Sequence, residues 1–375
     1  MISSTSNFNA HRRFTLTLLI ITLLSMTGFV ALGLYVQPNN GSTNEAWLVR
    51  NGGYAGRDYS WNMPQQAFIQ PLYSHDHYDR YYDTVILGDS FTDLYHPYQW
   101  QNYLAAATND SIMVFSLRRG ARITDVLNNP LFQQHPPKLF IYEIAERYMD
   151  ALISNLIPCN EQPQTLTKAV SDSPPKPHSH AISWGRYLAN RITFINRDTQ
   201  LHLSKLDELI SHTKKYLWRN FLRNVLDIEI TNTVKHKLTR SAPFSSRNTQ
   251  TLLTSVGDLN KQYWNATTVQ KIVCEIEHAR QQIEANGKTR FVMLIAPDKL
   301  TAYADFLNEQ KLQHISYIAD VANRLPTTVL RMDRSLQAAI HAGEIDVYLP
   351  DDTHWGWRGH QIAAETLLDF LQTQK

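Results

Sequence analysis

The chain has 375 residues, of which 43% are hydrophobic and 19% are charged. This balance is typical of a folded protein with a substantial core, and it excludes a chain that is disordered throughout. The formal net charge is only +2, so composition gives no electrostatic case for binding nucleic acid. Two cysteines, Cys159 and Cys274, lie far apart in the sequence, which leaves open whether they pair or remain thiols.

A long apolar segment lies close to the N-terminus. Residues 14–36 read FTLTLLIITLLSMTGFVALGLYV and carry no charge, which is long enough for a helix that crosses a bilayer. Arg12 and Arg13 precede it and no basic cluster follows closely, so residues 1–13 are expected in the cytoplasm. A cleaved signal peptide is the alternative, but the apolar run is longer than the usual signal core. We expect an anchor, and under either interpretation the rest of the chain works outside the cytoplasm.

The region after a linker and N-terminal extension at residues 37–82 has the pattern of an α/β domain, residues 83–375. Four short apolar runs rich in β-branched residues predict buried strands. These runs are residues 83–88, 111–117, 138–143 and 289–296. Helical spacing of apolar residues predicts one helix before Asn286-Gly287 and another over 358–372. Apolar strands that alternate with helices indicate a parallel sheet covered by helices on both faces.

Residues 151–262 interrupt this pattern and predict a mostly helical insertion in the domain. Residues 158 to about 182 are rich in proline and serine and predict a loop. Residues 183–240 have a helical and mildly basic pattern. These basic side chains form either a solvated face or a contact surface for an acidic polymer.

Two short motifs predict a catalytic site. Ser90 follows the first strand directly, in VILGDSFTD, which places its hydroxyl at the carboxyl edge of the sheet, where open α/β sheets hold their sites. A serine in such a turn is also an ordinary helix cap. Near the C-terminus, LPDDTHWGWRG brings His354 close to Asp351 and Asp352, after the strand-like residues 345–349. A serine nucleophile needs a general base, and the imidazole needs a carboxylate, so the two segments together predict a triad.

These motifs resemble a known family. Gly-Asp-Ser-Phe at residues 88–91, with a late Asp-x-His, resembles the SGNH (GDSL-type) hydrolase and acyltransferase superfamily. Asp-Thr-His-Trp at 352–355 resembles the Asp-x-His-Trp motif of AlgJ- and AlgX-type alginate O-acetyltransferase SGNH-like domains. YEIAERYM at 142–149 and LIAPDKLTAYADFL at 294–307 fit the same family. Here the serine motif comes first, as in ordinary GDSL esterases, whereas in the alginate enzymes the Asp-x-His-Trp motif generally comes first.

The resemblance implies a fold and an activity. The fold would be an SGNH/flavodoxin-like parallel sheet with helices on both faces, a helical insertion and one N-terminal transmembrane helix. The protein would be a single-pass protein of the bacterial inner membrane with its catalytic domain in the periplasm. It would transfer acetyl groups to an exopolysaccharide such as alginate, receive them from a membrane-bound O-acyltransferase partner, and need no cofactor. The alternatives are a carbohydrate acetylesterase and a non-catalytic polysaccharide-binding or assembly protein on the same fold.

The resemblance also implies roles for individual residues. Ser90 would be the nucleophile and His354 the general base and then acid. Asp352 would orient His354 by the narrower motif, whereas superfamily spacing selects Asp351. Gly120 would supply an oxyanion N–H beside that of Ser90, since YEIAER stands where the superfamily carries an asparagine donor.

Further residues are expected around the same pocket. They are Asp89, Glu143, Arg147 and Trp355. Glu143 and Arg147 lie four apart, which also fits a simple ion pair on a helix. His75 and His77 lack a third ligand at suitable spacing, so we expect no metal site.

Overall fold

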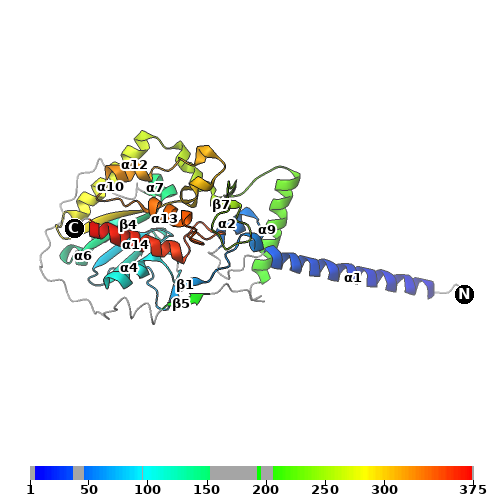
Figure 1. The fold of residues 1–375 in the computed structure, drawn as a ribbon. Coiled ribbons are helices and arrows are strands. Elements are labelled where there is room, and N and C mark those ends of the chain that lie inside the picture. Colours follow the sequence, from blue (N-terminus) through cyan, green and yellow to red (C-terminus); the bar gives the residue numbers. More distant parts are fainter. Residues whose placement is uncertain (1–4, 37–45, 95, 153–191, 196–205, 374–375) are drawn as a thin grey trace.

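The centre of the molecule is a parallel sheet of four strands (Figure 1). The computed structural model describes residues 5–36, 46–94, 96–152, 192–195 and 206–373. The sheet strands are β2 (Thr84–Gly88), β3 (Ile112–Ser116), β4 (Leu139–Ala145) and β8 (Arg290–Ala296). Their order across the sheet is β3-β2-β4-β8, which in chain order is 2-1-3-4, the arrangement of flavodoxin-like sheets. The four strands expected from the sequence and their parallel pairing are confirmed.

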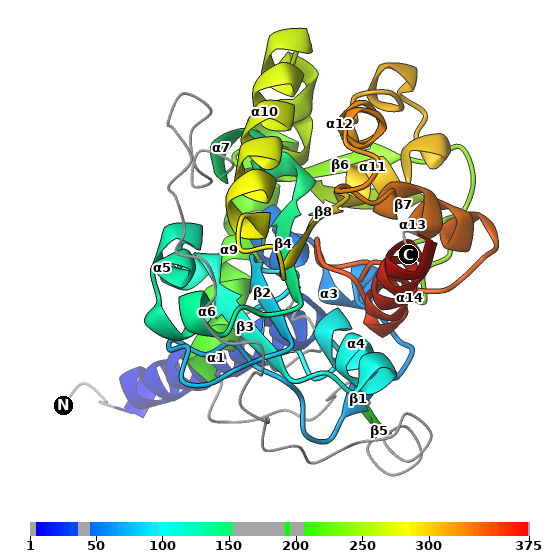
Figure 2. The same cartoon turned by 90° about the vertical axis from the view of Figure 1, so that its left-hand side faces the viewer.

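Helices cover both faces of this sheet, because alternate residues of each strand point to opposite sides. Ile86, Ile141 and Val292 belong to a core shared with α4, α13 and α14. Val85 and Phe140 belong to a second core shared with α5, α6, α10 and α12. Figure 2 shows α4 and α14 on one side of the sheet and α5, α6 and α10 on the other. The bounds are α4 (Trp100–Thr108), α5 (Ile123–Leu127), α6 (Pro130–Gln134), α10 (Ala266–Glu284), α12 (Ile318–Arg324), α13 (Met332–His341) and α14 (Trp357–Thr373).

The described part of the insertion expected at residues 151–262 contains strands as well as helix. The described helix is α9 (Leu206–Val225). Thr233–Lys237 forms strand β6, although we expected helix there, and pairs antiparallel with β7 (Thr251–Ser255). In the same way β5 (Ile192–Ile195) pairs with β1 (Gln65–Phe68). The loop expected at 158–182, and Cys159, lie outside the described residues.

Short elements complete the fold. Those of the N-terminal extension are α2 (Trp47–Gly52) and α3 (Gly56–Tyr59), and those at the strand ends are α7 (Met149–Leu152) and α11 (Lys299–Ala302). The strand expected over 345–349 is not formed. Tyr348 instead makes an isolated antiparallel bridge with Trp355, and Asp346 has a positive φ of 53° that a regular strand does not allow.

The N-terminal helix α1 (Thr5–Val36) projects from the body of the molecule (Figure 1). Its segment Asn9–Val36 is long and apolar enough to cross a membrane, and only 6% of its most apolar window is buried. A signal sequence near an N-terminus has the same properties. The chain therefore carries one N-terminal apolar helix of the kind found in membrane anchors and signal sequences. The end of α1 packs against α9, where Gly33 lies close to Leu209 and Thr213.

Candidate active site

Ser90 lies in a tight turn at the carboxyl end of β2. The turn is held by Asp89, whose Oδ1 accepts the Phe91 N–H at 3.0 Å and whose Oδ2 accepts the Ala145 N–H at 2.8 Å. Because Ala145 ends β4, these bonds fix the turn to the neighbouring strand. Gly88 precedes the turn, and a Cβ there would come within 2.8 Å of the Thr92 and Glu143 side chains, so only glycine fits. Asp89 thus shapes the turn and does not line the pocket.

His354 connects Ser90 to a carboxylate. Its Nε2 lies 2.9 Å from Ser90 Oγ, and its Nδ1 lies 2.5 Å from Asp352 Oδ1. The same Asp352 oxygen accepts the His354 backbone N–H at 3.1 Å. The other oxygen accepts the Trp47 backbone N–H at 3.0 Å, from helix α2 far away in the sequence. The three side chains predicted as a triad are therefore joined by hydrogen bonds in the order serine, histidine, aspartate.

The two adjacent aspartates have different surroundings. Burial would raise the pKa of Asp352, but the charge of His354 and the hydrogen bonds from His354 and Trp47 outweigh it and hold that pKa well below its usual range. Asp352 is therefore ionised at neutral pH. The charge of Asp351 acts on the buried Lys299 ammonium, and its backbone carbonyl accepts the Leu48 N–H at 3.1 Å. By contact with the imidazole, Asp352 is the residue that orients His354.

Lys299 holds the loop that carries Asp352 and His354. Its Nζ donates to the carbonyl oxygens of Leu349, Pro350 and Asp352 at 2.7, 2.9 and 3.0 Å. Burial lowers the pKa of this ammonium to about 8, and nearby aspartates oppose the shift. Lys299 lies in the segment 294–307 that fits the family, but the sequence predicts no role for this residue. Three carbonyl acceptors on one loop make it a positioning residue.

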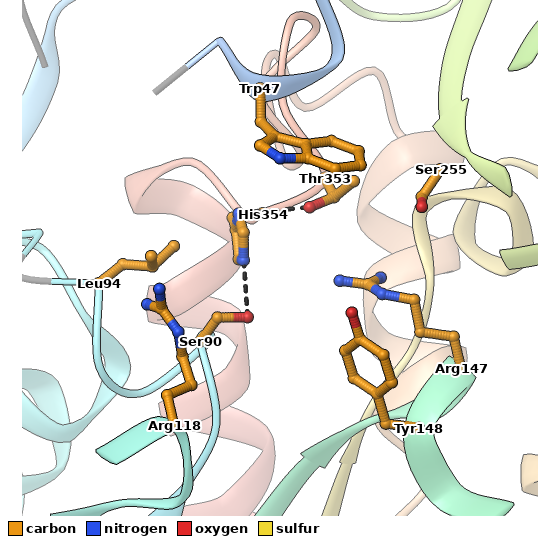
Figure 3. A pocket seen from close by; sticks show the side chains of 9 residues that line it. All are labelled: Trp47, Ser90, Leu94, Arg118, Arg147, Tyr148, Ser255, Thr353 and His354. Carbon is orange, nitrogen blue, oxygen red and sulfur yellow. Dashed lines mark hydrogen bonds between the residues drawn. The ribbon is translucent and has the colours of Figure 1, made fainter. Parts of the chain in front are cut away.

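A pocket of about 240 Å³ opens at Ser90 and His354. Figure 3 shows these two side chains on one side and Arg147 and Tyr148 across from them. The pocket lies beside the carboxyl ends of β2 and β4, where the strand order reverses and flavodoxin-like folds place their ligands. The lining residues are Trp47, Ser90, Leu94, Arg118, Arg147, Tyr148, Ser255, Thr353 and His354.

The family of the C-terminal region follows from comparison with known proteins. Residues 252–375 match the SGNH hydrolase-like domain of acetyltransferase AlgX. This match confirms the resemblance that the motifs indicated, and it includes Asp352 and His354, while Ser90 lies before its first residue. No curated protein and no solved structure matches the chain.

Arg147 enters the pocket from outside this AlgX-like region and is fixed by partners within it. Its Nη1 lies 2.6 Å from Asp298 and 3.4 Å from Asp258, and all three side chains are buried. Lys261, also buried, contacts the second Asp298 oxygen at 2.5 Å and Glu146 at 2.9 Å. This network holds the guanidinium in place. The alternative of an ion pair with Glu143 is wrong.

Two residues expected around the pocket have other roles. The Gly120 N–H donates to the Leu117 carbonyl at 3.1 Å and closes a 3₁₀ turn, so it is not available as an oxyanion donor here. Trp355 is fully buried, and its ring lies 4.6 Å from that of Phe91, in the core behind the Ser90 turn. The Gly120 N–H is used within its own turn, and the Trp355 ring is packed in the core, so neither residue lines the pocket.

Glu143 is a buried support of the serine turn. One carboxyl oxygen accepts the Asp89 N–H at 3.0 Å and the Thr92 hydroxyl at 2.8 Å. Burial and the neighbouring Asp89 carboxylate raise the pKa of Glu143 well above its ordinary value. The neutral carboxyl is therefore favoured in the folded protein.

Replacing Glu143 by glutamine should weaken the pH dependence of stability. The folded pKa is raised, so this group's contribution is fully present below its unfolded pKa near 4.5 and declines as the pH rises toward the folded value. We expect the Tm of wild type to fall more than that of Glu143→Gln between about pH 5 and about pH 8. Thermal unfolding at both pH values measures this, with the exposed Glu365→Gln as control. Equal slopes for all three proteins would refute an ionisable buried Glu143.

Six residues that line the pocket were given no role from the sequence, namely Trp47, Leu94, Arg118, Tyr148, Ser255 and Thr353. Tyr148 lies within the quoted YEIAERYM, so only its role was missed. Trp47 and Ser255 come from the extension and from β7, and no local pattern links either segment to Ser90. Among the described residues, no three histidine, cysteine, aspartate or glutamate side chains are placed to hold a metal ion.

Proposed function

We propose that this protein is an extracytoplasmic O-acetyltransferase that acetylates an exopolysaccharide through an acyl-Ser90 intermediate. The observation that carries the proposal is the hydrogen-bonded series from Ser90 Oγ through His354 to Asp352 at 2.9 and 2.5 Å. The AlgX-like match over residues 252–375 supports acetyl transfer as the reaction. The apolar helix α1 supports a location in the bacterial inner membrane, with the active site in the periplasm.

The geometry suggests the following steps. His354 Nε2 takes the proton of Ser90 as Oγ attacks the acetyl carbonyl, and the imidazolium then protonates the leaving group. His354 next takes the proton of a sugar hydroxyl, whose oxygen attacks the acyl carbon. Collapse of this second tetrahedral species returns the proton to Ser90 and releases the acetylated sugar. Ionised Asp352 stabilises the imidazolium in both halves and fixes its tautomer.

The oxyanion is assigned to the Ser90 N–H and the Arg147 guanidinium. Arg147 follows β4, the strand next to β2, which is where the superfamily places its asparagine donor. Its side chain faces Ser90 across the pocket (Figure 3) and is held by Asp298 and Asp258. A fixed cation at this position would stabilise charge that develops in the transition state without reorganisation.

Replacing Arg147 by methionine should lower kcat by about 10²- to 10³-fold, the usual cost of losing one oxyanion donor. Ester hydrolysis by purified protein measures this, and Arg147→Lys should recover part of the loss because it keeps the charge. Thermal unfolding serves as the control, since Asp298 and Asp258 lose the contact with the Arg147 guanidinium in the methionine variant. A variant that remains folded with kcat near wild type would exclude Arg147 from the oxyanion site.

The donor is assigned to a membrane-bound O-acyltransferase partner, and the acceptor to an exopolysaccharide such as alginate. An anchor would place the pocket beside a membrane partner that delivers acetyl groups. The specific polymer follows only from the resemblance to the alginate enzymes.

An acetylesterase is the second candidate, because the serine motif precedes the histidine motif as in ordinary GDSL esterases. Both functions use the same side chains and differ in whether a sugar hydroxyl or water attacks the acyl-serine. The test supplies purified full-length protein with a chromogenic acetyl ester and an oligosaccharide, and analyses the sugar by mass spectrometry. Acetylated sugar supports transfer, acetate alone supports the esterase, and no acetyl release from the ester refutes both.

A further inference from the structure

Helix α9 exposes an apolar face that the site does not use. Leu217, Phe221 and Val225 follow at intervals of four, and Trp218 lies beside them, so all four share one side of the helix. Trp218 is 59% exposed and Val225 is 63% exposed. The rings of Trp218 and Phe221 stack at 6.0 Å. The exposed apolar residues continue after the helix with Leu226, Ile228 and Ile230.

The opposite side of α9 packs on the catalytic body. Asn220 donates to the carbonyl of Gly53 at 3.0 Å, and Arg223 donates to that of Gly52 at 2.8 Å. Arg219 lies against Gly53 as well. Because these residues face helix α2, the apolar face points away from the body. Contiguous apolar surface of this kind on a protein normally marks a contact site.

The position of α1 indicates what covers this face. Gly33 near the end of α1 lies against Leu209 and Thr213 of α9, so the two helices are in contact. Figure 1 shows α9 lying across the end of α1, which extends away from the body on that side. If α1 runs close to the membrane normal, α9 lies along the membrane surface, with its apolar face toward the lipid.

The composition of α9 fits that location. Tryptophan and phenylalanine on one face are typical of helices that lie in the headgroup region, and exposed lysines beside them favour anionic lipid. Lys214 and Lys215 are both exposed one turn before Leu217 and Trp218. The basic pattern noted in the sequence therefore accompanies an apolar face and does not form a purely solvated surface.

We propose that α9 is an interfacial helix that inserts Leu217, Trp218, Phe221 and Val225 into the periplasmic leaflet of the membrane that α1 crosses. The proposal rests on the anchor part of the proposed function and is independent of the catalytic part. Together α1 and α9 attach the body at two points, which fixes its orientation as well as its location.

The test uses full-length protein reconstituted in vesicles of phosphatidylcholine and phosphatidylglycerol. Phe221→Cys is labelled with an environment-sensitive fluorophore, and nitroxide-bearing lipids serve as quenchers. Glu365→Cys, on the exposed side of α14, is the matched control. Wild-type protein treated with the same fluorophore gives the background fluorescence from labelling at other sites. We expect a blue shift and several-fold stronger quenching at 221 than at 365. Equal emission and quenching at the two positions would overturn the proposal.

Two further samples identify the cause of a failure. A label at Leu24→Cys in α1 reports whether the anchor is in the bilayer: if only this label is quenched, the anchor holds and the interfacial helix does not. If neither label is quenched, neither the anchor nor the interfacial helix is in the bilayer.

A label at Val225→Cys should lose its quenching when Leu217, Trp218 and Phe221 are replaced by serine. A blue shift at 221 that requires a high protein-to-lipid ratio would indicate a second copy of the chain on this face and would also overturn the proposal.

Discussion

Ser90→Ala should abolish hydrolysis of a chromogenic acetyl ester, with kcat falling by about 10³-fold or more. Without Oγ there is no atom to carry the acyl group, and His354 loses the partner that lies 2.9 Å from its Nε2. The fold should be unaffected, because the turn is held by the Asp89 carboxylate and not by the serine hydroxyl. The measurement is steady-state kinetics with purified full-length protein, together with intact-protein mass spectrometry for the acyl adduct.

Ser255→Ala is the matched control, since it removes a second hydroxyl that lines the same pocket. Ser255 Oγ accepts the Gly257 N–H at 3.2 Å and is not hydrogen-bonded to His354. We expect this variant to retain acyl-enzyme formation. Undiminished turnover by Ser90→Ala would remove the serine mechanism altogether, whether the product is acetylated sugar or free acetate.

Asp352→Asn should lower kcat by about 10⁴-fold, because an amide no longer favours the tautomer and charge that His354 needs. Asp351→Asn should have a much smaller effect on kcat, since the imidazole contacts the Asp352 carboxylate at 2.5 Å and the charge of Asp351 acts on Lys299. The adjacent pair thus offers two isosteric changes in one buried loop. Kinetics and thermal unfolding of both variants check the assignment.

The pH profile gives a separate readout of the same pair. Because the pKa of Asp352 is held well below its usual range, its protonation should not limit activity on the mildly acidic side of neutrality. If Asp351→Asn proved the more damaging change to kcat while both variants remained folded, the orienting carboxylate would be Asp351 and the narrower motif would have misled the assignment.

The sheet and the approach of Ser90 to His354 could be predicted from the sequence because their signals are local. Each strand of a parallel sheet covered on both faces is a continuous apolar run, as in Val85–Leu87 and Phe291–Ile295, and needs no knowledge of its neighbours. The carboxyl ends of such strands meet at one edge, so a serine after one strand and a histidine on a late loop were expected to come together. His354 Nε2 and Ser90 Oγ lie 2.9 Å apart, as this argument predicts.

What the sequence could not predict depends on contacts between distant segments. Trp47 reaches Asp352 across 305 positions, and Lys299 reaches Leu349 across 50. Nothing near either residue in the chain reveals such a partner. Strand β6 was mistaken for helix because TVKHK is short and polar, and it is stabilised as a strand by pairing with β7. Gly120 was assigned an oxyanion role because its sequence position did not show that its own turn uses the N–H.

The hydrogen bond from Trp47 to Asp352 also sets a limit on reach. Val36 ends α1 and Trp47 lies eleven positions later, so even a fully extended chain separates them by about 40 Å at most. If α1 is an anchor, the loop that carries Asp352 and His354 therefore stays within about 40 Å of the bilayer surface, and any acceptor has to reach the pocket in that layer.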